Sequence, residues 1–161
     1  VVKNGFLQNQ DQKYKCSIGY NGLNKNKNEG DGCTPIGTFK INKILYRPDK
    51  INIHRFNIES EVIEKKHGWC DDINSDSYNQ KIEFPFEQSA EHLHRNDDLY
   101  DIICVIDYNL NPIVKGKGSA IFLHVVRDDY SPTQGCIAIK KDELLQIAHN
   151  LIEDSTILIE D

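Results

Sequence analysis

The spacing of apolar and polar positions predicts a protein built mostly of β-strands. In GTFKINKILY, residues 37–46, apolar and polar residues alternate, which is typical of a strand with one buried face. Further apolar runs of strand length, bounded by turn residues, lie at 13–22, 101–109, 119–126, 135–139 and 156–160. The runs at 101–109 and 119–126 are the most continuously apolar, so we expect them in the core.

One segment has a clear helical period. In KDELLQIAHNLI, residues 141–152, the apolar side chains recur at three- and four-residue intervals, and Asp142 lies in the expected N-cap region. A second, short helix is expected around residues 88–95. The fold class predicted is mainly β with α (α+β), a compact β-sandwich or barrel with attached helices.

Composition narrows the class of protein. The 161 residues fit one domain, predicted here as residues 1–161, with 39% hydrophobic and 27% charged residues. The net charge of -6 argues against nucleic-acid binding, which usually needs a basic field. No apolar run approaches the ~20 residues that span a bilayer. The sequence leaves the oligomeric state open.

The chain has five cysteines, an odd number, so at least one thiol has no partner within the chain. They are widely spaced, with no CxxC pair and no zinc-ribbon pattern. This is not the pattern of a disulfide scaffold. Whether four of them pair stays open: Cys16, Cys33, Cys70 and Cys104.

Cys136 and His124 form a candidate catalytic pair. His124 ends the run SAIFLHVV, and Cys136 follows twelve residues later, after a polar, turn-rich segment. A strand, a loop and a second strand can bring an imidazole beside a thiol, and a cysteine nucleophile needs such a base. Gly135 permits close approach of a substrate, and backbone N–H groups around Gln134, Gly135 and Cys136 could form an oxyanion hole.

Other interpretations of these residues remain open. Cys136 could be a packed core thiol in a non-catalytic wall-binding or structural module, since free cysteine is often buried. His92 and His94, in HLHR, could bind zinc together with His67, Cys70 or Asp71, as in a zinc-dependent peptidase. No HExxH motif supports that alternative.

Two motifs resemble a known family. SPTQGCIAI, residues 131–139, preceded by IFLH, resembles the signature of the L,D-transpeptidase (YkuD-type) catalytic domain, a histidine followed by Ser/Thr-x-Gly-Cys. EGDGCTPIGTFKI, residues 29–41, resembles the second hallmark of that family. The stretches GWCDD, YN and DDLYD resemble a divergent branch of it.

The resemblance implies a mixed sheet or β-sandwich with flanking helices and a cysteine acyltransferase that acts on peptidoglycan stem peptides. Cys136 would form a thioester with the third residue of a tetrapeptide stem, with His124 as base and the Val125 carbonyl orienting its ring. An acceptor amine then gives a 3→3 cross-link, whereas water gives an L,D-carboxypeptidase or amidase. No cofactor and no metal are implied. Periplasmic or exported placement is expected, although the chain shows no leader.

The sequence departs from the family pattern around the nucleophile. The interval between histidine and cysteine is short, Gln134 replaces a histidine or acidic residue, and Ala138 replaces an arginine or asparagine. Arg127 is the predicted substitute for that arginine, and Thr133 and Gln134 are further substrate-contact candidates.

Two residues of the GWCDD stretch complete the substrate-contact candidates. Trp69 either anchors its loop in the core or walls the cleft. Asp71 either lies in a solvated turn or receives the ammonium group of a diaminopimelate side chain.

Overall fold

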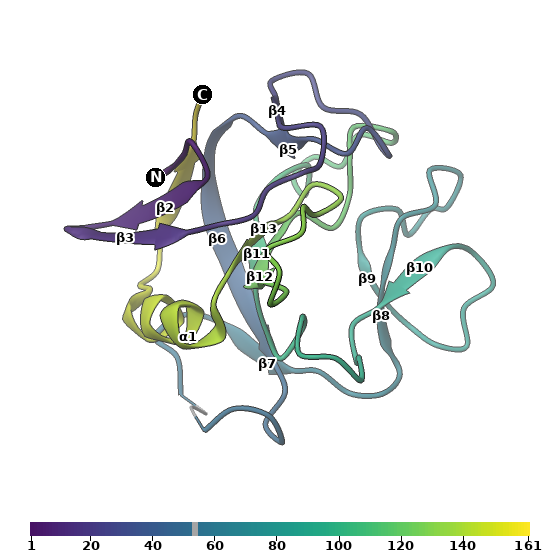
Figure 1. Ribbon diagram of the computed structural model, residues 1–161. Coiled ribbons are helices and arrows are strands. Elements are labelled where there is room, and N and C mark those ends of the chain that lie inside the picture. The colour runs from purple at the N-terminus through teal and green to yellow at the C-terminus, as the bar shows by residue number, and fades with distance from the viewer. Residues whose placement is uncertain (53–54) are drawn as a thin grey trace.

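The computed structural model describes residues 1–52 and 55–161, and one large mixed sheet dominates it (Figure 1). In spatial order its strands are β13 (Ile137–Ile139), β12 (Phe122–Val125), β11 (Ile102–Ile106), β6 (Gly37–Tyr46), β14 (Thr156–Ile159), β1 (Val2–Lys3), β2 (Phe6–Asn9) and β3 (Gln12–Lys15), with β7 (Ser60–Val62) beside β6. The predicted fold class, mainly β with α, is confirmed.

The direction of the strands places the candidate site. Within the sheet, β12 and β13 are parallel, whereas β12 and β11 are antiparallel. His124 pairs with Ala138, so Cys136 lies two residues earlier, just before β13 begins. Because β12 and β13 are parallel, the chain that leaves β12 must return to the opposite end of the sheet before it enters β13.

A smaller sheet lies to one side of the main one. It consists of β8 (His67–Cys70) between β9 (Lys81–Glu83) and β10 (Ala90–His92), all antiparallel. The prediction of a short helix around residues 88–95 is therefore wrong. Its one strongly apolar residue, Leu93, cannot form a helical face, and pairing with β8 supplies backbone hydrogen bonds instead.

The helix α1 (Lys141–Asn150) covers one face of the main sheet. Leu144, Ile147 and Ala148 are buried in a cluster with residues of β11, β12 and β13. The predicted helix is confirmed, but it ends at Asn150, and its N-cap is Lys140 rather than Asp142. The Lys140 N–H donates to the carboxylate of Glu143 at 3.3 Å, so this backbone donor at the start of the helix has a hydrogen-bond partner.

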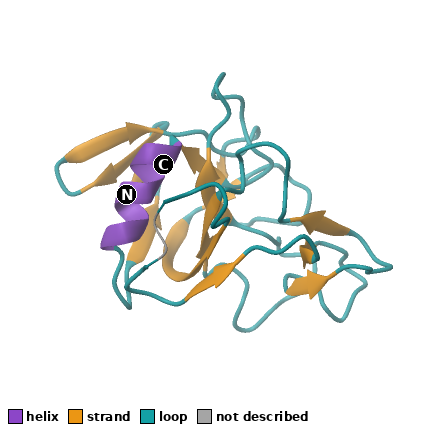
Figure 2. Cartoon of the chain, turned by 90° about the horizontal axis from the view of Figure 1, so that it is seen from below, coloured by secondary structure: helices purple, strands orange, loops and turns teal. Residues whose placement is uncertain are grey.

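The opposite face of the same strands packs against the small sheet. A second buried cluster joins Phe122 of β12 to Trp69 of β8 and to Leu93 and Tyr100. Figure 1 shows α1 and the small sheet on opposite sides of the central strands. Seen from below in Figure 2, the single helix of the described chain again lies away from the small sheet.

Residues 13–22 form less strand than predicted. β3 ends at Lys15, and the chain beyond it makes only isolated bridges, Ser17 with Ala138 and Gly19 with Thr133. This segment then leads to the short parallel pair β4 (Leu23–Asn24) and β5 (Thr34–Pro35). It therefore borders the loop that carries Cys136. No helix among the described residues is long and apolar enough to cross a membrane.

Candidate active site

Alternation along β12 sends His124 to the side of the sheet that faces the small sheet. Phe122 and His124 share that face, whereas Leu123 and Val125 belong to the cluster under α1. Cys136 packs against the cluster around Phe122. The two candidate catalytic residues are thus on the same face of neighbouring strands.

His124 and Cys136 line one cavity of about 460 Å³. Its walls come from both sheets and from the crossover loop: Asp71 follows β8, Glu91 lies on β10, and Tyr100 precedes β11. Side chains far apart in sequence therefore converge where the chain enters β13.

His124 is held as a neutral base. Its Nδ1 is 2.9 Å from the carbonyl oxygen of Val125, and because a carbonyl only accepts, Nδ1 carries the hydrogen and Nε2 keeps a lone pair. The Tyr100 ring meets the imidazole edge to face, with centroids 5.3 Å apart. Burial lowers the pKa of His124 to about 4, so the ring is uncharged near neutral pH.

Cys136 rests as a thiol that donates its hydrogen to a backbone carbonyl. Its Sγ donates to the Ala120 carbonyl at 3.1 Å and accepts the Phe122 N–H at 3.4 Å. Burial, followed by the charge of Glu91, raises the pKa of this thiol to about 12. Because none of the hydrogen bonds among the described residues joins Sγ to His124, proton transfer requires the thiol to rotate away from Ala120.

Thr133 shapes the turn that presents the nucleophile. Its hydroxyl donates to the Cys136 carbonyl at 2.6 Å and accepts the Gly135 N–H at 3.1 Å. This corrects the prediction that the Gly135 N–H contributes to an oxyanion hole, because that donor is already used. The Thr133 hydroxyl is likewise committed to the turn rather than free for substrate.

Gly135 is required by close packing. Its φ is +148°, and a Cβ added here would come 2.9 Å from the backbone oxygen of Cys33. Any larger residue would push the nucleophile loop away from the glycine-rich segment beside β5. The glycine therefore fixes how closely the two sequence motifs approach each other.

The glycine-rich motif braces the nucleophile loop. Thr34 is fully buried, and its hydroxyl donates to the Cys136 carbonyl at 3.4 Å and accepts the Gly19 N–H at 2.9 Å. Asp31 accepts the Cys33 N–H at 2.9 Å and pairs with Lys27 at 2.7 Å. The two motifs thus form one structural unit around Cys136.

A comparison with known protein families finds a match over nearly the whole chain. The family model of the L,D-transpeptidase catalytic domain (YkuD) matches residues 4–159. The chain belongs to the L,D-transpeptidase catalytic domain family. A search of curated proteins finds no match. Membership assigns the domain L,D-transpeptidase-type enzymatic activity on the peptides of peptidoglycan.

The structure of this L,D-transpeptidase domain places Trp69 in the core. The Trp69 indole packs against the Phe122 ring with centroids 5.2 Å apart and donates to Asn79 Oδ1 at 3.0 Å. The same Asn79 oxygen accepts the Ala120 N–H at 3.0 Å. Trp69 therefore supports the backbone that holds the resting thiol, and it does not line the cavity as the wall role would require.

The other substrate-contact candidates do line the cavity. Arg127 and Gln134 are exposed at its rim, and Asp71 lies deeper. Sequence reasoning missed Glu91 and Tyr100, which face the same space and share a hydrogen bond of 2.8 Å. Nothing in the stretch SAEHLHR distinguishes Glu91 from a surface carboxylate, because its position depends on the pairing of β10 with β8.

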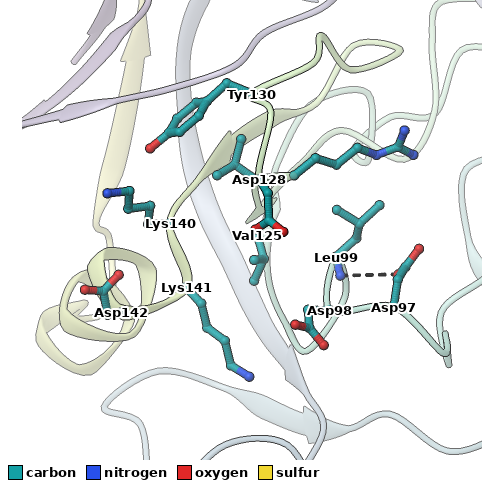
Figure 3. A pocket seen from close by; sticks show the side chains of 11 residues that line it. Asp97, Asp98, Leu99, Val125, Asp128, Tyr130, Lys140, Lys141 and Asp142 are labelled. Atoms are coloured by element: carbon teal, nitrogen blue, oxygen red, sulfur yellow. Dashed lines mark hydrogen bonds between the residues drawn. The ribbon is translucent and has the colours of Figure 1, made fainter.

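A second, larger cavity of about 640 Å³ adjoins the first, and the two share Leu99 and Arg127. Figure 3 shows the turn of Asp97, Asp98 and Leu99 on one side, with the Leu99 N–H donating to Asp97. Lys140 and Lys141, at the start of α1, lie on the other side. The larger cavity is lined by neither Cys136 nor His124, so the smaller cavity is the candidate active site.

The zinc site considered as an alternative does not form. His92 stacks on the Phe84 ring, and His67 Nδ1 accepts the Glu64 N–H at 3.1 Å. Within residues 1–52 and 55–161 no three histidine, cysteine or acidic side chains are grouped to hold a metal ion. His92 therefore packs against an aromatic ring, and His67 stabilises a turn.

Proposed function

We propose that Cys136 is the nucleophile and His124 the general base of an L,D-transpeptidase reaction that forms 3→3 cross-links between peptidoglycan stems. The proposal rests on one observation above others: the Cys136 thiol and a neutral His124 open into the same cavity. The Val125 carbonyl leaves Nε2 of His124 as the atom able to take a proton. We also propose an exported, cell-wall location, because the family to which the chain belongs acts on peptidoglycan.

In the first half-reaction, Cys136 attacks the carbonyl carbon of the third residue of a tetrapeptide stem. The thiol proton passes to His124 Nε2 as the S–C bond forms. The C–N bond to the terminal residue then breaks, and the proton on His124 passes to the departing amine. The product is a thioester on Cys136 and a free amino acid.

In the second half-reaction, the amine of another stem attacks the thioester. His124 takes a proton from this amine, the new C–N bond forms, and the C–S bond breaks. The proton returns to the Cys136 sulfur, which restores the resting thiol. The sequence of steps balances without an oxidant, a reductant or a further reactant.

The oxyanion of each tetrahedral intermediate needs a donor other than the Gly135 N–H. We assign this role to the Cys136 N–H, with the Gln134 side chain at the rim as a second donor. Arg127 is assigned to a substrate carboxylate, since it is the exposed cation shared by the two cavities. Arg127 would thereby take the role of the arginine or asparagine that the family has at the position of Ala138.

Transfer, rather than hydrolysis, requires space for two peptides at once. The adjoining cavities joined at Leu99 and Arg127 provide such space. We therefore assign the donor stem to the cavity with Cys136 and the acceptor stem to the neighbouring one. If only water reaches the thioester, the same site is an L,D-carboxypeptidase.

Mass spectrometry of purified muropeptides after incubation tests the function. Cross-linked dimers and a protein mass increased by one acyl group are expected. Trimmed tripeptides alone would instead show hydrolysis. The Cys136→Ala variant should give neither product, whereas Cys16→Ser, altered in the core away from the cavity, should retain both. Turnover by Cys136→Ala would exclude the proposed nucleophile.

A further inference from the structure

A buried lysine lies against the turn that carries the nucleophile. Lys27 belongs to the loop between β4 and β5, and 4% of its surface is exposed, whereas Lys25 in the same loop is exposed. An ammonium group is costly to remove from water, so lysine is rarely buried unless it is paired or has a function. Lys27 therefore differs from an ordinary solvated lysine of a loop.

Two glycines make room for the Lys27 side chain. At Gly118, where φ is +105°, an added Cβ would come 2.8 Å from Lys27 Cε. At Gly135, an added Cβ would come 3.4 Å from Lys27 Nζ. The ammonium group therefore lies against the residue that precedes Cys136 in the chain, and its stem is enclosed by close packing on Gly118.

One carboxylate holds the ammonium group in place. Lys27 Nζ donates to Asp31 Oδ1 at 2.7 Å and to the Asn28 carbonyl at 3.4 Å. Burial acts to raise the pKa of Asp31, but hydrogen bonds from Lys27 and from the N–H groups of Asn28 and Cys33 outweigh it, so this pKa lies below its usual value. Because backbone N–H groups share the charge of Asp31, part of the lysine charge is left uncompensated.

Lys27 also lines the recess beside the nucleophile. This recess of about 70 Å³ borders Cys136, and its acidic side chains are Glu29, Asp71 and Glu91. Among the residues that the structure describes, Lys27 is the one cation that lines it. Without this charge, a negatively charged sulfur would form next to three carboxylates alone, which like-charge repulsion opposes.

The cations of the main cavity are placed differently. Arg95 and Arg127 line that cavity, but Arg95 forms an ion pair with Asp97 at 2.6 Å, and Arg127 is exposed at the rim. Water and salt screen the charge of an exposed group more than that of a buried one. The field of the buried Lys27 is therefore retained better at the nucleophile than that of Arg127.

The charge of Lys27 acts on the thiol in the direction that the reaction needs. Burial raises the pKa of Cys136 and Glu91 raises it further, whereas a backbone N–H and Lys27 lower it. Burial also lowers the pKa of His124 and raises that of Tyr100, so both rings are uncharged near neutral pH. The balance of charge at the sulfur therefore depends on Glu91 and Lys27, which oppose each other.

We propose that Lys27 is a positioning residue of the Cys136 reaction: its buried ammonium group offsets the carboxylates of the recess and stabilises the negative charge that develops on the sulfur and on the oxyanion beside it. The inference rests on the proposed function and adds a residue to its machinery. Lys27 acts through its field and its contact with Gly135, without touching the substrate. A charge held in place before the reaction is effective because nothing has to reorganise as the transition state forms.

Alkylation of Cys136 by iodoacetamide tests the inference, because the thiolate is the form that reacts. At pH 8, with the label located by mass spectrometry of the Cys136 peptide, Lys27→Met should react roughly tenfold more slowly than the wild-type domain, since the thiolate fraction falls when the charge is removed. The control Lys25→Met, altered at the exposed lysine of the same loop, should react at the wild-type rate. Equal rates for folded Lys27→Met and the wild-type domain would overturn the inference.

Two further variants separate charge from bracing. Asp31→Asn removes the same ion pair but leaves the lysine charge less compensated, so Cys136 should react faster than in the wild-type domain. Glu91→Gln added to Lys27→Met should restore the rate towards the wild-type value, because the two opposing charges are then both absent. Slower reaction in both Asp31→Asn and Lys27→Met would show that the ion pair only braces the loop. Should Lys27→Met not fold, an Asp31→Asn rate at or below the wild-type rate decides against the inference, and a faster one supports it.

Turnover distinguishes failure of this inference from failure of the proposed function. With muropeptide as substrate, Lys27→Met should lower kcat roughly tenfold and change KM by less than about twofold, since the side chain is not placed against the substrate. The expected alkylation rates without any turnover by the wild-type domain would retain the effect of Lys27 on Cys136 and reject the proposed function. Normal turnover by Lys27→Met with an unchanged alkylation rate would do the opposite.

Discussion

The two faces of β11, β12 and β13 differ in the polarity and the packing of their side chains. The face under α1 is apolar throughout and fully packed, with Leu123 and Ile137 among its members. The face towards the small sheet has a similar core around Phe122, but beside it lie His124, Cys136 and the half-buried carboxylates Asp71 and Glu91. Adjacent residues of one strand thus serve stability on one side and chemistry on the other.

This division has a physical basis. The helix covers one face of the sheet, whereas the small sheet packs on the other face around Phe122 and leaves a cavity beside this contact. Packing under α1 fixes the positions of the strands. On the opposite face, those fixed positions hold the side chains that line the cavity. The comparison predicts that changes on the two faces have separable effects on activity and stability.

The largest effect is expected for His124→Ala. Loss of the base should lower kcat/KM by roughly 10²–10⁴-fold, because His124 is the proposed acceptor of the thiol proton. The variant should still fold, with a lower melting temperature because the contact with Tyr100 and the hydrogen bond to Val125 are lost. Steady-state turnover of muropeptides and a thermal melt test both statements. Normal turnover by this variant would refute the assignment.

On the face under α1, Leu144→Ala should do the reverse. Leu144 is fully buried under the sheet, so its truncation should cost about 2–5 kcal/mol of stability. Denaturant titration measures the loss. At temperatures where the variant remains folded, kcat/KM should stay near the wild-type value. A large fall in activity of the folded variant would show that the faces are coupled.

Thr34→Val tests the brace between the two motifs. The substitution keeps the shape but leaves the buried Gly19 N–H without its acceptor, which should cost about 1–3 kcal/mol. Activity should also fall, because the Cys136 carbonyl loses one of its donors. Stability and kcat/KM measured together show whether the brace serves both. Unchanged values for both would exclude it.

The smallest expected effect is the dependence of kcat/KM on pH. With its pKa lowered to about 4, His124 is neutral above that value, so kcat/KM should stay high down to pH 5. It should then fall about tenfold per pH unit below the pKa, as protonation removes the base. Circular dichroism at each pH verifies that the domain stays folded. An activity limb near pH 6.5 would show that His124 is not desolvated in the working enzyme.

Much of the fold could be predicted from local patterns. The alternation in residues 37–46 and the apolar runs around Cys104 and Leu123 correspond to β6, β11 and β12. The leucine spacing after Lys140 corresponds to α1. These predictions succeeded because a buried face imposes its period on each element separately.

The small sheet could not be predicted in this way. Residues 88–95 have too few apolar side chains to define a period, and the strand there depends on pairing with β8. Trp69 illustrates the same limit, since its neighbours could not distinguish a core anchor from a cleft wall. Its burial follows from contact with Phe122, more than fifty residues away.

The sequence by itself determined β6, β11, β12, the helix α1 and the candidate pair of Cys136 and His124, because these depend on short spacings and a recognisable motif. Only the tertiary structure decided that the Gly135 N–H is used by Thr133 and that the resting thiol donates to Ala120. It also brought Glu91 and Asp71 to the nucleophile. The reason is physical: hydrogen-bond partners and burial arise from contacts between distant segments, which no local pattern encodes.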